Sequence, residues 1–230
     1  MTNVLDPLLK DLGISVKNKE LLTQALIHRS YLNESRRKIT SNERLEFLGD
    51  SILSFVVSNY LYQQFPQLKE GDLTNFRSSI VKTTTLASVA QTLKLGTYLF
   101  LSKGEEEGGG RTNPSILADT FEAVLGALYL DVGLEKTKKV IDKFLLPLLE
   151  QIIVKKLYKD AKSSLQELVQ EGTKISPVYT VIKEVGPDHA KEFTVGVYVN
   201  DKLLGEGSGK SKQDAEQHAA RAALEKCKPE

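Results

Sequence analysis

Residues 42–51, NERLEFLGDS, open a stretch in which apolar residues recur at helical spacing as far as residue 64. One side of this stretch carries an apolar stripe, formed by Leu45, Leu48, Ile52, Phe55 and Val56. The other side is apolar as well, through Phe47, Leu53 and Val57. A helix that is hydrophobic nearly all round is typically buried. The sequence therefore predicts a buried helix over residues 42–64.

Carboxylates interrupt this apolar helix on one face, at i, i+3 and i+7: Glu43, Glu46 and Asp50. Residues 116–130, ILADTFEAVLGALYL, repeat the pattern, because Asp119 and Glu122 are their only charged residues. Burying an ionised carboxylate is costly unless a cation or a hydrogen-bond donor lies beside it. A divalent cation would supply the missing charge, and oxygen ligands favour Mg²⁺ or Mn²⁺ over zinc.

Each acid also has a structural interpretation. Residues 40–43, TSNE, fit a capping box, in which Glu43 is only a helix-start residue. Gly49 and Asp50 fit a helix end followed by an N-cap. Glu46 can pair with Arg44 on the same helix. From the residues alone these alternatives stay open beside the metal site.

The first two thirds of the chain show helical periodicity throughout. Helices are expected in five segments: 20–32, 42–64, 72–93, 115–130 and 134–155. Residues 103–114, KGEEEGGGRTNP, carry an acidic triplet and four glycines, three of them consecutive, and we expect a mobile loop there. His28 is interpreted as a packed core residue rather than a ligand.

After a polar linker the pattern changes to period two. We expect a short helix over 163–170, then strands over 178–185, 192–199 and 202–206. An alanine-rich helix over 212–226 closes the chain. The expected fold is thus an all-α domain followed by an α+β domain of order α-β-β-β-α.

Composition restricts the class of protein. With 230 residues, 40% hydrophobic and 27% charged, the chain has the length of two soluble domains. No apolar run is long enough to span a bilayer, and the N-terminus does not resemble a signal peptide. A single cysteine, Cys227, excludes an intramolecular disulfide and favours a reducing, cytoplasmic setting. These features predict a protein without membrane attachment.

Net charge is close to balanced. The total is +1, and residues 160–230 hold 10 Lys/Arg against 12 Asp/Glu, a balance of −2. A nucleic-acid binder usually carries a basic footprint. Any contact with RNA must therefore come from local clusters of basic residues.

Several motifs resemble the signature of the ribonuclease III family. They are NERLEFLGDS at 42–51, ALIHRS at 25–30, EGDL at 70–73 and SILADTFE at 115–122. The C-terminal part resembles the double-stranded-RNA-binding fold that accompanies the nuclease domain in bacterial members. The resemblance covers nearly the whole chain and implies an all-α endonuclease domain over residues 1–154, a linker over 155–161 and an RNA-binding domain over 162–228.

The resemblance also implies roles for individual residues. Four acids would form the metal site of each subunit: Glu46, Asp50, Asp119 and Glu122. Asp50, Glu122 and Glu43 would be catalytic, with Glu43 near the substrate rather than a core ligand. Phe47 would help to lock a homodimer. The implied cofactor is Mg²⁺, with Mn²⁺ as a possible substitute.

The implied reaction is hydrolysis of phosphodiester bonds in double-stranded RNA, giving 5′-phosphate ends and short 3′ overhangs. The implied substrates are precursors of ribosomal RNA and other structured RNAs. Duplex RNA is recognised by shape, 2′-hydroxyls and phosphates. The expected contacts are Gln166, Glu167, His189, Lys210 and Lys212, the last two flanking Ser211 at the start of the closing helix, where free backbone N–H groups favour phosphate.

Two other classes of protein compete with this interpretation. A non-catalytic duplex-RNA-binding protein could use the same fold, but such a protein would have lost acidic residues, and all five are present. A helical protein–protein adaptor explains neither the acids nor the α-β-β-β-α module.

Overall fold

The computed structural model describes residues 4–35, 38–154, 161–173, 175–187 and 191–226. The chain forms two compact units, Met1–Tyr158 and Lys159–Glu230. The linker predicted at 155–161 lies almost wholly outside the described residues. Among the helices that are described, none is long and apolar enough to cross a membrane.

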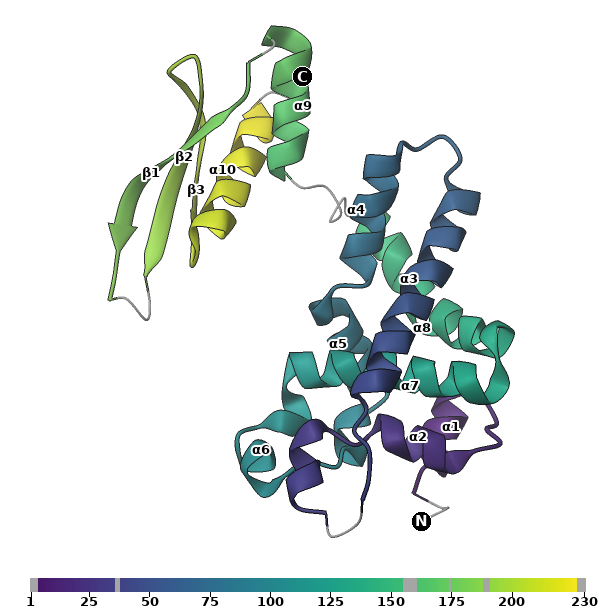
Figure 1. Ribbon diagram of the computed structural model, residues 1–230. Helices are drawn as coiled ribbons and strands as arrows, with labels where there is room; N and C mark the ends of the chain where they lie inside the picture. The colour runs from purple at the N-terminus through teal and green to yellow at the C-terminus, as the bar shows by residue number, and fades with distance from the viewer. Residues whose placement is uncertain (1–3, 36–37, 155–160, 174, 188–190, 227–230) are drawn as a thin grey trace. The chain divides into compact units, whose positions relative to one another are not determined.

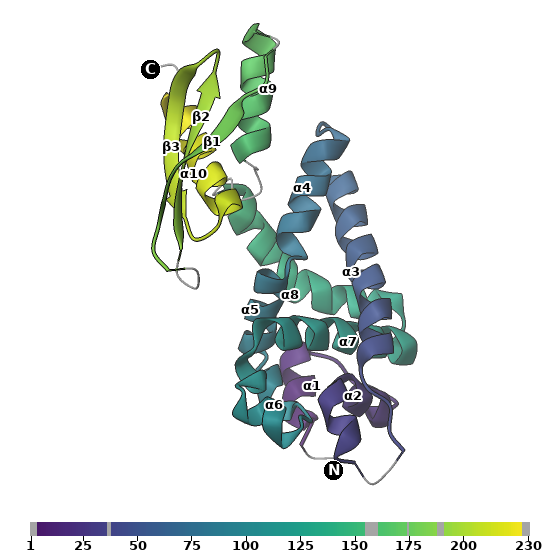
Figure 2. The same ribbon diagram turned by 60° about the vertical axis from the view of Figure 1, so that its left-hand side comes forward.

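The first unit is helical, as the sequence predicts (Figures 1 and 2). Its α-helices are α1 (Asp6–Leu12), α2 (Lys19–Ala25), α3 (Glu43–Gln64), α4 (Glu70–Ile80), α5 (Thr83–Thr92), α6 (Lys103–Glu107), α7 (Pro114–Val132) and α8 (Leu134–Val154). Three 3₁₀ turns join them: η1 (Arg29–Asn33), η2 (Leu95–Tyr98) and η3 (Gly110–Thr112). Helix α7 is the central element, because α2, α3, α5 and α8 all pack against it.

Helices α3 and α7 cross in direct backbone contact. A Cβ atom added at Gly49 would overlap the backbone carbonyl of Glu122, and one added at Gly126 would overlap that of Leu45. Two glycines that face each other at a crossing let the helix backbones approach more closely than any side chain allows. This crossing brings the acidic face of α3 against the acidic face of α7.

The bounds of two predicted helices need correction. The helix expected over 20–32 ends at Ala25, because Ile27 forms a bridge with Phe100 and a 3₁₀ turn follows. The helix expected over 72–93 is two helices, because Lys82 has an extended backbone. Three threonines follow Lys82, and the Thr85 hydroxyl donates a hydrogen bond to the Ser79 carbonyl at 3.1 Å. β-Branched residues of this kind disfavour a continuous helix.

The loop expected over 103–114 is also ordered, as α6 and η3. Arg111 fixes it by donating to the carbonyls of Gly96 and Leu99 and to the Glu106 carboxylate, at 2.7–3.0 Å. The prediction that helix α3 is buried all round is wrong, because Phe47 is 77% exposed and Phe55 is 58% exposed. The period-3.6 pattern identifies apolar faces but does not say whether this chain or another one covers them.

The second unit has the predicted α-β-β-β-α order, with α9 (Ala161–Thr173), β1 (Val178–Val185), β2 (Glu192–Val199), β3 (Lys202–Gly209) and α10 (Lys212–Lys226). The sheet is antiparallel in the order β1-β2-β3, with both helices on one face (Figure 1). Strand β3 extends past the predicted end at residue 206, because glycines 205, 207 and 209 allow α10 to lie close on it. The core joins Leu165 and Val197 to the alanine stripe of α10.

Candidate metal centre

Three of the predicted acids meet at the α3–α7 crossing. Glu46 from α3 and Asp119 and Glu122 from α7 each offer a carboxylate oxygen, and these oxygens lie within 4.8 Å of one another. All three side chains are half-buried. The spacing within each helix gives one acidic face, and the Gly49–Gly126 contact then brings the two faces together.

The pKa values of these carboxyls are all raised. Burial, followed by the charges of Asp50, Asp119 and Glu46, raises the pKa of Glu122 to about 8. Burial is also the main reason for the raised pKa of Glu46, followed by repulsion from Asp119, Glu43 and Asp50. Both causes act by disfavouring the ionised form. The raised pKa values therefore indicate too little positive charge near the cluster to offset its carboxylates, as the residue pattern suggests.

Asp119 differs in having a histidine neighbour, His28. Burial raises its pKa, whereas the charge of His28 lowers it. His28 is half-buried, and its Nδ1 atom lies 2.9 Å from the Ser30 hydroxyl. Sequence reasoning assigned His28 to the core; the structure places it beside the acidic cluster. The segment ALIHRS was noted from the sequence, but nothing in its periodicity indicates that His28 approaches α7.

Asp50 and Glu43 lie at the exposed edge of the cluster. Asp50 accepts a hydrogen bond from the Ser54 hydroxyl at 3.5 Å and is close enough to raise the pKa of Glu122 and Glu46. Glu43 accepts a hydrogen bond from the Ser41 hydroxyl at 2.8 Å and lies 3.6 Å from the Arg29 guanidinium. Ser41 and Arg29 are therefore neighbours of the site that the sequence did not reveal.

None of the three structural interpretations of the acids is supported by the structure. Helix α3 begins at Glu43 with Asn42 at the N-cap position and no side-chain cap, so the capping box over 40–43 is not formed. The helix runs through Gly49 and Asp50 to Gln64, so it does not end there. Within the described residues no ion pair joins Glu46 to Arg44. The donor set of Glu46, Asp119 and Glu122, with Asp50 beside it, consists only of carboxylates, which suits a hard divalent cation.

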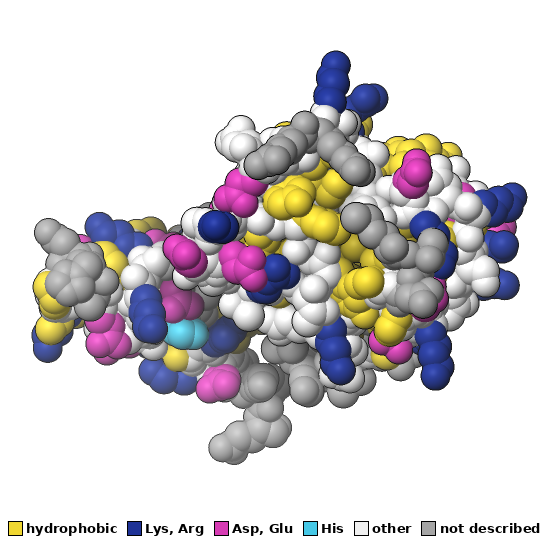
Figure 3. Space-filling view, turned by 90° about the horizontal axis from the view of Figure 1, so that it is seen from below, with side chains coloured by type: hydrophobic (Ala, Val, Ile, Leu, Met, Phe, Trp, Pro, Cys, Tyr) yellow, Lys and Arg dark blue, Asp and Glu magenta, His cyan; other side chains and the backbone are white. Residues whose placement is uncertain are grey.

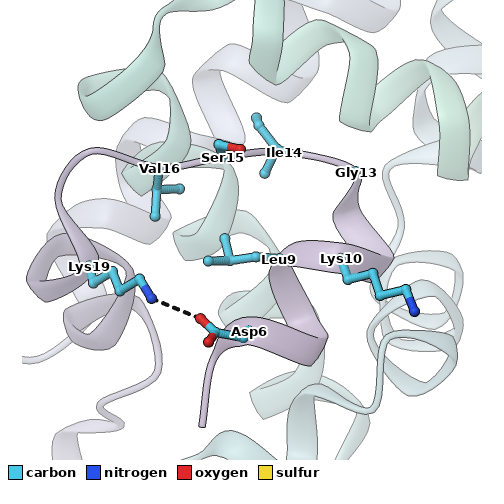
Figure 4. Close-up of a pocket in the computed structure, with 8 residues that line it drawn as sticks. All are labelled: Asp6, Leu9, Lys10, Gly13, Ile14, Ser15, Val16 and Lys19. Atoms are coloured by element: carbon cyan, nitrogen blue, oxygen red, sulfur yellow. Dashed lines mark hydrogen bonds and ion pairs between the residues drawn. The ribbon is translucent and has the colours of Figure 1, made fainter. Parts of the chain in front are cut away.

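A surface hollow of about 490 Å³ lies elsewhere, between α1 and the start of α2 (Figure 4). The Lys19–Asp6 ion pair at 2.8 Å crosses it, and none of its eight lining residues belongs to the acidic cluster. On the face drawn in Figure 3, basic and acidic side chains are interspersed. That mixture agrees with the nearly balanced net charge.

The second unit displays most of the predicted RNA contacts. Gln166 and Glu167 are exposed on α9, and Lys210 is exposed in the turn before α10. Lys212 is exposed too, but its ammonium lies 3.4 Å from the Glu184 carboxylate. His189 and Cys227 lie outside the described residues.

Comparisons with known proteins point to one family. A ribonuclease-III-like family model matches residues 18–174, and a double-stranded RNA binding motif matches residues 161–227. Ribonuclease 3 from Pelotomaculum thermopropionicum is 51% identical over 216 residues, covering 94% of this chain and 90% of the relative. Ribonuclease 3 from Geobacillus kaustophilus is 47% identical over 215 residues, covering 93% and 87%.

A solved structure agrees with these relatives. It is the nuclease domain of ribonuclease III from Campylobacter jejuni, described with structural flexibility in the region involved in dimer formation. It is 39% identical to this chain with a TM-score of 0.57, and it covers 62% of this chain and 99% of its own. The all-α nuclease fold followed by a double-stranded-RNA-binding fold is thereby confirmed.

Proposed function

This chain belongs to the ribonuclease III family and is an endonuclease of double-stranded RNA, and from that premise we propose that the α3–α7 acidic cluster is its catalytic metal centre. Glu46, Asp119 and Glu122 would hold the metal, with Asp50 beside them. The observation that carries this proposal is the convergence of three carboxylates within 4.8 Å at raised pKa. We assign Mg²⁺ as the ion, with Mn²⁺ as a substitute.

The site must offset the negative charge of the RNA phosphodiester during hydrolysis. In hydrolysis water attacks a phosphodiester that is already negative, and the departing 3′ oxygen gains further charge. A bound divalent cation supplies the positive charge that offsets both changes and favours deprotonation of the water. The chain's own carboxylates hold that charge in place. Asp50 and Glu43 extend the site toward solvent, where Arg29 beside Glu43 provides a cation for the RNA backbone.

The exposed part of α3 supports assembly of two copies. Phe47 lies beside a hollow of about 630 Å³ whose lining includes Leu21, Leu48 and the 55% exposed Leu130. A large aromatic side chain left in water next to an apolar hollow is typical of a protein–protein interface. We propose a homodimer with Phe47 in its interface. Two such sites on one duplex would cut both strands and leave 5′-phosphates and short 3′ overhangs.

The second unit would deliver the duplex to this centre. Gln166 and Glu167 on α9 suit contacts with 2′-hydroxyls, and Lys210 and Lys212 suit phosphates at the start of α10. We include His189 as an RNA contact on the basis of the family resemblance alone. We place the protein in the cytoplasm, acting on ribosomal RNA precursors and other structured RNAs.

A cleavage assay tests the metal centre. The purified chain is incubated with a long perfectly paired RNA in Mg²⁺, in Mn²⁺ or in EDTA, with a single-stranded RNA as control. Glu122→Gln should abolish cleavage while RNA binding persists, whereas Glu107→Gln, on the exposed surface of α6, should cut normally. If Glu122→Gln cleaves the duplex undiminished, the assignment of the centre is wrong. Duplex that is bound but not cut by the unmodified chain would favour the non-catalytic alternative.

A further inference from the structure

Strand β1 contains a bulge that changes which side chain faces the helices. Val181 pairs with Val195, and the register then shifts, so that Lys183 pairs with Thr194 and Glu184 with Phe193. Directly paired residues of antiparallel strands share a face, and successive residues alternate between faces. Val195 belongs to the core under the helices. Because of the extra residue, Glu184 rather than Lys183 lies on the helix side, next to Phe193.

At that position Glu184 meets two lysines. Its two carboxylate oxygens lie 3.3 Å from the Lys191 ammonium and 3.4 Å from the Lys212 ammonium. The Lys212 ammonium is also 5.6 Å from the centre of the Phe193 ring. Hydrogen bonding from Lys191, and then from Lys212, holds the pKa of Glu184 below its ordinary value, so the carboxylate is charged at neutral pH.

These two lysines lie near the start of α10, where the proposed RNA contact places a backbone phosphate. Lys212 is the first residue of α10, and Lys191 directly precedes β2. Phe193 also pairs with Gly209, so the end of β1, the start of β2 and the turn before α10 lie side by side. A carboxylate and a phosphate present the same kind of anionic oxygen to an ammonium group. The Glu184 carboxylate and an RNA phosphate therefore compete for the same lysine ammonium group.

We propose that Glu184 is an internal counter-charge that competes with RNA phosphate for Lys212 and Lys191 and so weakens duplex binding. The inference rests on the proposed RNA contact at the start of α10. It predicts weak, salt-sensitive duplex binding by a unit that has no excess of basic residues. RNA that engages both lysines leaves Glu184 without either partner, and Glu184 then recruits a cation from solution. That recruitment offsets part of the counterion release that drives binding.

The test measures binding of the full chain to a fluorescent RNA duplex of about 20 base pairs, long enough for one RNA-binding domain. EDTA prevents cleavage, and anisotropy titrations are made at several salt concentrations. Glu184→Gln should bind about threefold more tightly at low salt, as expected for loss of exposed ion pairs. Its plot of log affinity against log salt should be steeper by about one. Glu184→Thr introduces a residue that favours strands, and it should also bind the duplex more tightly and with a steeper salt dependence.

Two controls separate this effect from a general change of net charge. Glu206→Gln removes one exposed carboxylate that is paired with Gly196, on the sheet face away from the helices, and should change affinity much less. In a Lys212→Gln background the gain from Glu184→Gln should shrink. Unchanged or weaker binding by both Glu184 variants, with unaltered circular dichroism, overturns the inference. Failure of the unmodified chain to bind duplex RNA would instead overturn the proposed RNA contact itself.

Discussion

Replacing Glu122 by glutamine should stabilise the metal-free protein at alkaline pH while removing its response to metal. In the unfolded chain this carboxyl has its ordinary pKa of 4.5, and folding raises it to about 8. The folded protein therefore holds a proton that the unfolded chain has lost between these two values. Stability from this group is complete below pH 4.5 and is lost as the pH rises through 8. Glutamine keeps the shape and has no acidic proton, so it stays neutral as the pH rises.

The size of the effect follows from the pKa. A change from 4.5 to about 8 corresponds to a free energy on the order of 5 kcal/mol when the group is fully ionised. Glu122 is half-buried and shares its repulsion with Glu46, Asp50 and Asp119, so solvent screening reduces the figure to about 2 kcal/mol. In a unit of this size that is a rise in Tm of about 4–8 °C.

Thermal unfolding followed by circular dichroism in EDTA measures this directly. At pH 8.5 Glu122→Gln should melt above the unmodified chain, and the difference should shrink to nothing near pH 4.5. Added Mg²⁺ should raise the Tm of the unmodified chain, because a ligand that binds only the folded state stabilises it, and should leave the variant unchanged. The reasoning is refuted if the variant melts at or below the unmodified chain at pH 8.5, or if Mg²⁺ stabilises both equally.

Three further predictions address the helix crossing, the dimer and the RNA contact. Gly126→Ala places a Cβ atom against the Leu45 carbonyl, and should cost about 2 kcal/mol or more in denaturant unfolding and reduce cleavage more than RNA binding. Phe47→Ala, at a position 77% exposed in a single chain, should leave the fold intact and shift the mass measured by light scattering from dimer toward monomer. Lys210→Gln should weaken duplex binding at every sequence tested and lower the salt slope by about one, as measured by anisotropy.

The acidic residues were predictable because they contrast with their surroundings. Asp119 and Glu122 are the only charges in a 15-residue apolar stretch, and Glu46 and Asp50 share one helical face. This contrast comes from the high cost of burying charge, which only a few arrangements offset. The fold class followed from the change of period, from helical spacing before residue 155 to alternation after 178.

Other features depend on contacts that periodicity does not encode. The break between α4 and α5 comes from an extended Lys82 and a threonine hydroxyl that bonds the Ser79 carbonyl. The glycine-rich segment before α7 is ordered because Arg111 donates hydrogen bonds to the carbonyls of Gly96 in η2 and of Leu99, which follows η2. Helical periodicity gives no sign of these contacts. Counting glycines predicts flexibility correctly only when no side chain from the segment is anchored elsewhere.

The proposed metal centre depends on two residues that carry no charge. Sequence spacing puts Glu46 and Asp50 on one face of α3, and Asp119 and Glu122 on one face of α7, but it does not say that the two faces meet. The meeting requires Gly49 and Gly126, whose missing side chains let the backbones touch. Close approach brings Glu46 near both acids of α7, so the charge of Asp119 helps to raise the pKa of Glu46, and the charge of Glu46 helps to raise the pKa of Glu122. Under the proposed function, the same contact that raises these pKa values should also create the affinity for a cation, so a change at either glycine should weaken both effects together.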